Sequence, residues 1–458
     1  MQDRLYEIMS ITLRYWYVFL IGCIFFLCLR DTASMGQDDR GKDEGILVFI
    51  SILLLITGLG LLSFREVKTI DYDIVILAGL AAAVFLVQYF ILKLLFRGLD
   101  GILLIIANTL FIIGLLLLQR LSPDLARNQV QWFALGSIAL VISTVVALKI
   151  SDTRWLLYPM MIAGVVLLSL APLFGRVIGG AKNWISIEVS GREFGFQPSE
   201  LVKLILIFVF AIEFSQKRGF KERLPVFIFT GLCMLILVFS RDLGGALHFF
   251  MVFIFIYPIA TSDVYITLLA AGAGAVGSFI SYRLFSHVKV RVEAWRNPWA
   301  QIEDRGYQIA HALIAIGSGG LFGSGLGLGI PYIIPASRTD LIFAAICEEM
   351  GILIGFMVIA FYAIITVRGA YIAMNSKYAL DSLLAMGATA SLAIQSFIII
   401  GGVIKLIPLT GVTMPFASYG GSSMVVSFAM IGIIEGVAIK SYNIQGEELE
   451  EALEEDEG

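Results

Sequence analysis

The sequence predicts an all-α polytopic membrane protein. Its 458 residues are 59% hydrophobic and only 15% charged, and their mean hydropathy is +0.90. Many apolar runs are about 17 to 25 residues long, which is the length that a helix needs to cross a bilayer. The alternating pattern of barrel strands is absent, and hydrocarbon cannot satisfy free backbone N–H and C=O groups, so we expect each run to form a helix.

Thirteen candidate spans follow one another along the chain. They lie near residues 8–30, 45–64, 73–96, 101–118, 130–150, 154–175, 200–215, 223–239, 243–260, 262–284, 352–372, 382–404 and 422–440. The first run is too long, and too weakly followed by a small-residue cleavage site, for a removed signal peptide. We expect it to stay as an anchor. The four cysteines lie in or beside apolar runs without metal-ligand spacing and are expected to act as small hydrophobic residues.

Positive charge between two spans predicts the orientation. Four of the nine residues in SQKRGFKER (215–223) are Lys or Arg, so the positive-inside rule places this segment in the cytoplasm. Counting spans from it places the C-terminus inside and the segments 176–199, 285–351 and 405–421 outside. An odd number of spans then places the N-terminus outside. The last residues, 442–458, are expected to form an acidic cytoplasmic tail.

Three of the segments between spans are unusually polar. Residues 176–203, 285–351 and 407–423 are rich in Gly, Pro, aromatic and charged residues, whereas the segments assigned to the cytoplasm are mostly short. Long loops of this composition usually carry binding or catalytic residues. We therefore expect the three segments to form one water-accessible site on the outer side.

Ionisable residues at the ends of spans support a polar cavity. Each costs about 2.5 to 3.5 kcal/mol at mid-bilayer unless it is paired or hydrated. Glu200 and Lys203 are three residues apart, so on a helix they share a face and could pair. Asp242 follows Arg241 at the start of a span, where an acid suits a helix N-terminus. Capping or snorkelling would explain any one of these residues, but a shared cavity explains the set better.

Two other patterns do not indicate cofactor sites. GSGLGLG (323–329) has glycines at every second residue and no preceding strand, so it does not fit a dinucleotide fingerprint and is expected to be a close-packing loop. The three histidines are scattered without metal-ligand spacing, which argues against a structural zinc site. We expect no nucleotide cofactor and no nucleic-acid partner.

Several motifs resemble those of the RodA/FtsW/SpoVE family, the SEDS proteins of bacterial cell-wall synthesis. They are, in order, GGAKNWI with FQPSELVKL, SRDLGGAL, NPW followed by GYQIAHALIAIGSGGLFGSGLGLG, RTDLIFAAICEEMG, and IPLTGVTMPFASYGGSS. The resemblance covers residues 101–441 and implies a ten-helix core with a large outer loop at 285–351. Residues 1–100, with three additional N-terminal spans, form an extension that the resemblance does not cover.

The resemblance implies a peptidoglycan glycosyltransferase in the bacterial cytoplasmic membrane. Such proteins polymerise lipid II, a disaccharide-pentapeptide on undecaprenyl pyrophosphate, together with a class B penicillin-binding protein and other cell-wall or divisome proteins. A departing pyrophosphate needs cations, either Arg and Lys or a divalent metal such as Mg or Mn. Arg and Lys residues on the predicted outer side are Lys182, Arg241, Lys289, Arg291, Arg296, Arg305 and Arg338.

The outer loop departs from the family pattern at the catalytic acid. The resemblance places that acid at position 301, where this chain has Gln301, which cannot accept a proton as a carboxylate does. Glu303 and Asp304 lie two and three residues further on, and a loop could present either at the same place. We favour Asp304 as the catalytic residue. If both are only solvated loop charges, the chain is a weak or inactive homologue.

The remaining site residues complete the predicted cavity. We hypothesise that Lys182 and Arg241 bind the pyrophosphate, that Glu200 and Lys203 form a paired element of the cavity, and that Asp242 binds a metal or orients a helix. The predicted cavity or substrate-binding set is Lys182, Trp184, Glu200, Lys203, Arg241, Asp242, Arg296, Asp340, Glu348, Ser418 and Ser422.

Three functions remain open at this stage. The first is polymerisation of lipid II during division, elongation or sporulation. The second is a flippase for a lipid-linked precursor, which would need access from both sides of the membrane. The third is a noncatalytic scaffold of the cell-wall machinery, which Gln301 favours.

Overall fold

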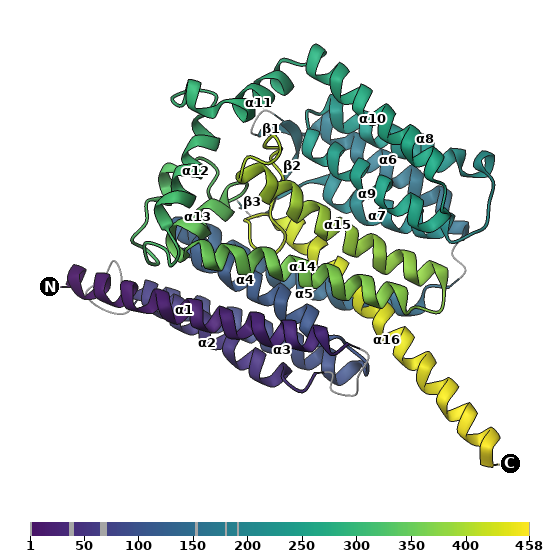
Figure 1. Cartoon of the computed structure of the whole chain (residues 1–458), viewed down its shortest axis with the longest axis horizontal. Helices are drawn as coiled ribbons and strands as arrows, with labels where there is room; N and C mark the ends of the chain where they lie inside the picture. The colour runs from purple at the N-terminus through teal and green to yellow at the C-terminus, as the bar shows by residue number, and fades with distance from the viewer. Residues whose placement is uncertain are drawn as a thin grey trace.

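The computed structural model describes residues 2–35, 41–64, 71–151, 154–178, 181–189 and 192–457. These residues form sixteen α-helices and one small sheet, which confirms the predicted all-α membrane architecture (Figure 1). Twelve of the helices are long and apolar enough to cross a membrane. They are α1 (Gln2–Ala33), α2 (Glu44–Ser63), α3 (Tyr72–Leu95), α4 (Gly101–Leu121), α5 (Pro123–Lys149), α6 (Leu157–Phe174), α8 (Phe220–Phe239), α9 (Leu243–Thr261), α10 (Val264–Leu284), α14 (Ile352–Met374), α15 (Ala379–Val403) and α16 (Gly421–Glu457).

The thirteenth predicted span is α7 (Pro198–Phe214). Its 17 residues are at the lower limit for crossing a bilayer, and its contacts with α6, α9, α15 and α16 bury most of its side chains. Proline occupies the first turn of α7, as it does in α5. Proline is tolerated there because the N–H that it lacks would have had no partner within the helix. The thirteen predicted spans therefore correspond to thirteen helices.

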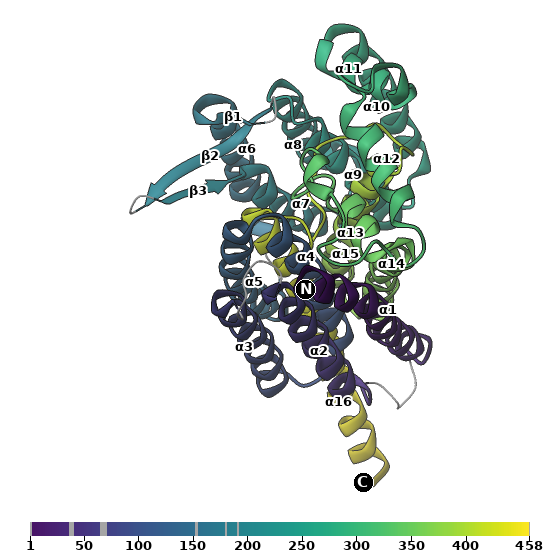
Figure 2. The same cartoon turned by 90° about the vertical axis from the view of Figure 1, so that its left-hand side faces the viewer.

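The polar segments contain further structure that the sequence reasoning did not predict. The strands β1 (Arg176–Ile178), β2 (Ala181–Val189) and β3 (Arg192–Phe196) form an antiparallel sheet in that order, and Figure 2 shows β2 and β3 projecting from the helices. The alternating Ile-Ser-Ile-Glu-Val of β2 is typical of a strand and was the available signal. The remaining elements are η1 (Arg154–Leu156), α11 (Ser286–Arg296), η2 (Pro298–Gln301), α12 (Tyr307–Gly319), η3 (Pro331–Ile333) and α13 (Ile342–Met350).

The core is centred on α4, whose membrane-spanning stretch is entirely buried. Helices α2, α3, α5, α13, α14 and α16 contact it. A Cβ atom on Gly114, in the middle of α4, would lie 2.2 Å from the backbone oxygen of Ala417. Gly114 therefore lets the segment between α15 and α16 approach the centre of the bundle.

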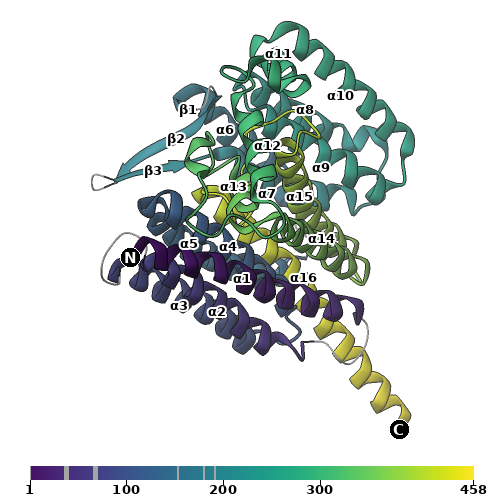
Figure 3. The same cartoon turned by 60° about the vertical axis from the view of Figure 1, so that its left-hand side comes forward.

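The first three helices pack side by side along one flank of the bundle (Figures 1 and 3). α1 contacts α14, and α2 contacts α4. Polar contacts cross the same interface, because Asn108 Nδ2 donates to Gln88 Oε1 at 2.9 Å and the hydroxyls of Ser51 and Thr109 lie 3.2 Å apart. The N-terminal helices thus share a core with the helices that follow them.

The N-terminal end of α1 also holds the glycine-rich loop at 323–329. The hydroxyls of Tyr6 and Ser10 donate to the Leu326 carbonyl at 2.9 and 2.8 Å. From the other side, Glu349 Oε2 accepts from the Gly327 N–H at 3.0 Å. Figure 3 shows this end of the molecule, with the sheet and α11 to α13, opposite the C-terminal end of α16.

Candidate functional site

A cavity of about 1020 Å³ lies where the polar segments meet. Its lining comes from the start of α5, the sheet with the start of α7, the junction of α8 and α9, the segment from α11 to residue 340, and residues 409–421. The three segments predicted to form one site therefore do so. The charged residues that line it are Asp124, Arg127, Glu200, Lys203, Arg241, Asp242, Arg291, Arg305 and Asp340.

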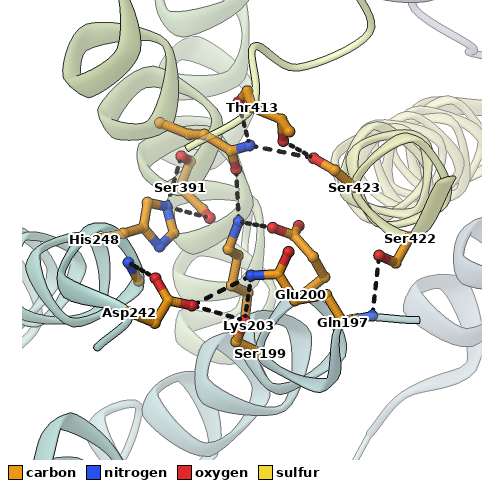
Figure 4. A network of polar contacts seen from close by, with 12 residues as sticks. Gln197, Ser199, Glu200, Lys203, Asp242, His248, Ser391, Thr413, Ser422 and Ser423 are labelled. Atoms are coloured by element: carbon orange, nitrogen blue, oxygen red, sulfur yellow. Dashed lines mark hydrogen bonds and ion pairs between the residues drawn. The ribbon is translucent and has the colours of Figure 1, made fainter. Parts of the chain in front are cut away.

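The floor of the cavity holds the predicted pair of Glu200 and Lys203. Lys203 Nζ donates to Glu200 Oε1 at 2.8 Å and to Gln395 Oε1 at 2.9 Å, and Figure 4 shows this lysine at the centre of the network. Gln395 in turn donates to the Thr413 carbonyl at 2.9 Å and to the Ser423 hydroxyl at 3.3 Å. The pair is buried and ties α7 to α15 and to the segment before α16.

His248 extends the same network, although no sequence pattern indicated a role for it. Its Nε2 lies 3.0 Å from the Ser391 carbonyl and 3.1 Å from the Ser391 hydroxyl (Figure 4). In the part of the chain that the structure describes, His248 Nδ1 and Glu200 Oε2 have no hydrogen-bond partner. Both residues contribute to the lining of the cavity, although these two atoms are themselves buried.

Asp242 caps helix α9 and organises the wall above the lysine. One carboxylate oxygen accepts from the Gly245 N–H at 2.8 Å, and the other accepts from Asn183 Nδ2 at 3.1 Å and Gln197 Nε2 at 3.2 Å. Arg241 before it adopts a left-handed conformation with φ of 61°. Of the two roles predicted for Asp242, these contacts support the orientation of a helix.

Positive charge gathers on the side of the cavity formed by α11. Arg291 Nη1 donates to the Thr410 carbonyl at 2.9 Å. Burial, and then the charges of Arg241 and Arg291, lower the pKa of His287, which places both guanidinium groups in one region. Burial raises the pKa of Asp340 to about 6, while a hydrogen bond with Thr339 and the charge of Arg291 act to lower it.

The three residues considered for catalysis lie outside the cavity lining. Gln301 ends η2 and is exposed, as is Glu303. Asp304 has a side chain that is 82% exposed, and its Oδ2 lies 3.9 Å from Nε of Arg305. Arg305 does line the cavity, so Asp304 lies beside the rim of the cavity and not within it.

The other predicted residues divide into two groups. The cavity brings together Trp184, Glu200, Lys203, Arg241, Asp242 and Asp340. Outside its lining, Lys182 Nζ donates to the Leu173 carbonyl at 3.4 Å, and Arg296 is exposed at the end of α11. Glu348 is buried and accepts from the Ile330 N–H at 2.8 Å, so it supports the glycine-rich segment.

The two serines are placed directly behind the lining. The Ser418 hydroxyl donates to the Thr339 carbonyl and accepts from the Met414 N–H at 2.9 Å. The Ser422 hydroxyl accepts from the Gln197 N–H at 3.3 Å (Figure 4). Both serines therefore fix neighbouring backbone that borders the cavity.

The described residues do not form a protein-only site for a metal ion. Among them, no three His, Cys, Asp or Glu side chains gather as a ligand set. Both oxygens of Asp242 already accept hydrogen bonds. The side chains of the described residues therefore do not fit a bound divalent cation, and we assign no step of the reaction to a metal ion.

Comparison with known proteins identifies the family and the fold. The family model described as cell cycle protein, FtsW/RodA/SpoVE, matches residues 90–443. The chain belongs to this family. The matched region contains every residue that lines the cavity and begins within α3, so most of the N-terminal extension lies outside the FtsW/RodA/SpoVE pattern.

Several curated proteins are similar over most of the chain. A peptidoglycan glycosyltransferase RodA of Mycobacterium tuberculosis is 32% identical over 372 residues, covering 74% of this chain and 78% of that protein. A probable peptidoglycan glycosyltransferase FtsW of Bacillus subtilis is 34% identical and covers 60% of this chain and 73% of its own length. Stage V sporulation protein E of the same organism is 33% identical, covering 60% of this chain and 75% of that protein.

Solved structures share the fold of the part of this chain that they match. One, described as the structural coordination of polymerization and crosslinking by a peptidoglycan synthase complex, has a TM-score of 0.63 and 25% identity, and covers 75% of this chain and 98% of the compared chain. The rod shape determining protein RodA of Thermus thermophilus has a TM-score of 0.51 and 25% identity, and covers 74% of this chain and 96% of its own.

Proposed function

We propose that this chain is a peptidoglycan glycosyltransferase that polymerises lipid II into glycan strands at the outer face of the cytoplasmic membrane. The observation that carries the proposal is the cavity of about 1020 Å³ lined by both signs of charge, in a chain of the FtsW/RodA/SpoVE family. Relatives named peptidoglycan glycosyltransferase resemble the chain over its matched core. Polymerisation explains the polar cavity and the family together.

The charges of the cavity suit a pyrophosphate-linked sugar. Arg241, Arg291 and Arg305 line it, and guanidinium groups bind phosphate oxygens with paired, charge-assisted hydrogen bonds. A leaving pyrophosphate gains negative charge in the transition state, so fixed cations stabilise it more than the ground state. Glu200, Lys203 and His248 add polar side chains to the floor of the same cavity.

The chain is a multi-pass membrane protein, and we propose its orientation from charge. The basic segment at 215–223 lies between α7 and α8, and the positive-inside rule assigns it to the cytoplasm. On that assignment the acidic C-terminal tail is cytoplasmic and the cavity faces outward. An outward cavity suits the assembly of glycan outside the membrane.

We also propose a partner of the class B penicillin-binding type. One structurally similar protein is described as part of a peptidoglycan synthase complex that coordinates polymerization and crosslinking. A transpeptidase beside this chain would crosslink strands as they leave the cavity. Relatives named RodA, FtsW and stage V sporulation protein E all match, so the process served is elongation, division or sporulation.

The experiment uses the purified full chain, with and without its transpeptidase partner, given labelled lipid II and Mg²⁺ or Mn²⁺. Glycan chains resolved by gel electrophoresis support polymerisation. Movement of lipid II across liposomes without polymer would support a flippase instead. If the chain binds its partner but makes no polymer under any condition, it is a noncatalytic scaffold, which is the alternative that Gln301 favours.

A further inference from the structure

Glycosyl transfer in this cavity requires a base. At position 301, where the family resemblance places the catalytic carboxylate, this chain has a glutamine, which cannot act as one. A sugar hydroxyl that attacks an anomeric carbon must lose its proton to a positioned group, usually a carboxylate. Position 301 is Gln301, and the nearby acids Glu303 and Asp304 are exposed and lie outside the cavity lining. The base is therefore to be sought among the carboxylates within the cavity.

Three of the four cavity carboxylates are poorly suited to take a proton. Asp124 is exposed at the start of α5. Glu200 is held at 2.8 Å by the ammonium group of Lys203. Asp242 accepts hydrogen bonds on both oxygens and caps α9. A carboxylate that is already bound to donors or solvated as an anion has little tendency to accept a further proton.

Asp340, the fourth, has different surroundings. It lies between η3 and α13, in the same segment as Gln301, and lines the cavity next to Gly411. A Cβ atom on Gly411 would lie 3.4 Å from Asp340 Oδ2 and 3.8 Å from Arg291 Nη2, so this carboxylate and this guanidinium face the same point of the wall. Its burial also favours the protonated form.

We propose that Asp340 is the general base of glycosyl transfer in this chain. The inference rests on the proposed function. Asp340 removes the proton of the acceptor sugar hydroxyl as that oxygen forms a bond to the anomeric carbon of the donor. The bond from the anomeric carbon to the pyrophosphate oxygen breaks, and its electron pair leaves with the lipid pyrophosphate. The proton on Asp340 then passes to water, and no other reactant is needed.

The neighbouring cations complete this arrangement. The charge of Arg291 opposes the effect of burial on the pKa of Asp340, and Arg241 and Arg305 line the same cavity for the leaving pyrophosphate. Besides Asp340, the titratable and charged groups that face the cavity from the packed elements are Asp124 and Arg127 of α5, Glu200 and Lys203 of α7, Arg241 and Asp242 before α9, His248 of α9, Arg291 of α11, Arg305 before α12, and Tyr419 before α16.

The test compares polymerisation by wild type, Asp340→Asn and Asp304→Asn, each with the same transpeptidase partner. Asp340→Asn is expected to lower kcat by at least about 100-fold, which is the usual contribution of a general base, and to leave the Kd for lipid II within about threefold. Asp71→Asn is the matched control, since this aspartate caps the start of α3 and lies outside the cavity lining. Melting temperatures establish that each variant is folded.

Two further readouts separate a base from a structural residue. The wild-type rate is expected to rise as pH increases through about 6, because the base acts only when ionised. Arg291→Gln removes a charge that lowers the pKa of Asp340, so this limb of the profile should move to higher pH. Formate added to the Asp340→Ala variant is expected to raise its polymerisation rate at least about tenfold, because the small carboxylate can replace the missing base.

The outcomes distinguish this inference from the function beneath it. If wild type polymerises and Asp340→Asn is equally fast, the base assignment is overturned and the proposed function stands. The same holds if only Asp304→Asn is inactive, or if Asp340→Asn loses lipid II binding as strongly as rate. If wild type makes no polymer with any partner, both proposals are overturned.

Discussion

Asp31 at the end of α1 and Arg368 in α14 form a buried ion pair, with Oδ1 of the aspartate 3.0 Å from Nη1 of the arginine. Both side chains are 3% exposed. The same guanidinium binds Asp100 at the start of α4, with Nη2 2.7 Å from Oδ1. One arginine therefore joins the N-terminal extension to two helices of the family core.

Removal of one partner from this pair should destabilise the protein. Asp31→Ala removes one of the carboxylates that bind the buried guanidinium of Arg368. Loss of one partner of a buried ion pair lowers the free energy of unfolding by about 3 to 5 kcal/mol. We expect a clear fall in the melting temperature in detergent. Lys377→Ala is the control, since its ion pair with Glu448 is exposed and screened by solvent and should contribute little to stability. Equal effects of the two substitutions would contradict the role of Arg368.

A side chain on Gly114 should disturb the cavity from a distance. Gly114→Ala places a Cβ atom against the Ala417 backbone and forces the segment after α15 away from α4. Overpacking of this kind costs about 1 to 3 kcal/mol, and we expect polymerisation to fall as well. The matched control is Gly79→Ala in α3, where nothing lies within 4 Å of the new Cβ. Its stability should be unchanged or slightly higher.

The Glu200 and Lys203 pair is expected to show strong coupling. Lys203→Met leaves Glu200 and Gln395 without their donor, and we expect a cost of about 3 to 5 kcal/mol. Adding Glu200→Gln to that variant removes the unpaired charge and should recover part of the loss. A double-mutant cycle measured by denaturation should give a coupling energy of about 0.5 to 3 kcal/mol. Additive effects would show that the pair is not a functional unit of the core.

Stability should depend on pH through Asp340. Burial raises its pKa to about 6 in the folded state, so folding disfavours the ionised form. The cost is absent below the unfolded pKa of about 4, grows as pH rises, and is complete above about 6. Asp340→Asn is therefore expected to be more stable than wild type at pH of about 7, by about 1 to 3 kcal/mol, and equal to it near pH of about 4. Melting curves at both pH values measure the difference.

A chelator should not unfold the protein. The described residues form no ligand set for a resident metal, so EDTA removes nothing on which the fold depends. We expect the melting temperature to be unchanged by EDTA, whether or not polymerisation needs added Mg²⁺. A fall of several degrees, restored by Mg²⁺, would show that a structural cation is held by the protein.

The helices were predictable because their signal is strong and local. A run of apolar residues in hydrocarbon has few alternatives to an α-helix, so hydropathy alone predicts a helix at each of the thirteen positions. The sheet at 176–196 was missed because a polar outer segment is not restricted in this way, although the alternation in β2 carries a weak signal. Water permits strand, helix and loop alike.

The cavity was only partly predictable, because its members come from distant parts of the chain. Glu200 and Lys203 were accessible to sequence reasoning, since three residues on a helix fix their geometry. Asp304 was favoured from its closeness in sequence to Gln301, but the loop turns its carboxylate toward solvent beside Arg305. Asp340 was predicted only as a cavity residue, because its contact with the Gly411 region depends on how two loops pack.

The enclosure of α4 constrains how the protein is assembled in the cell. This helix is synthesised early, but α14 and α16, which cover part of it, are synthesised long afterwards. An apolar helix is stable in lipid, so α4 can remain inserted with acyl chains around it until the later helices are synthesised and pack against it. Insertion of α4 therefore does not depend on its final partners, whereas completion of the cavity has to follow the last helix.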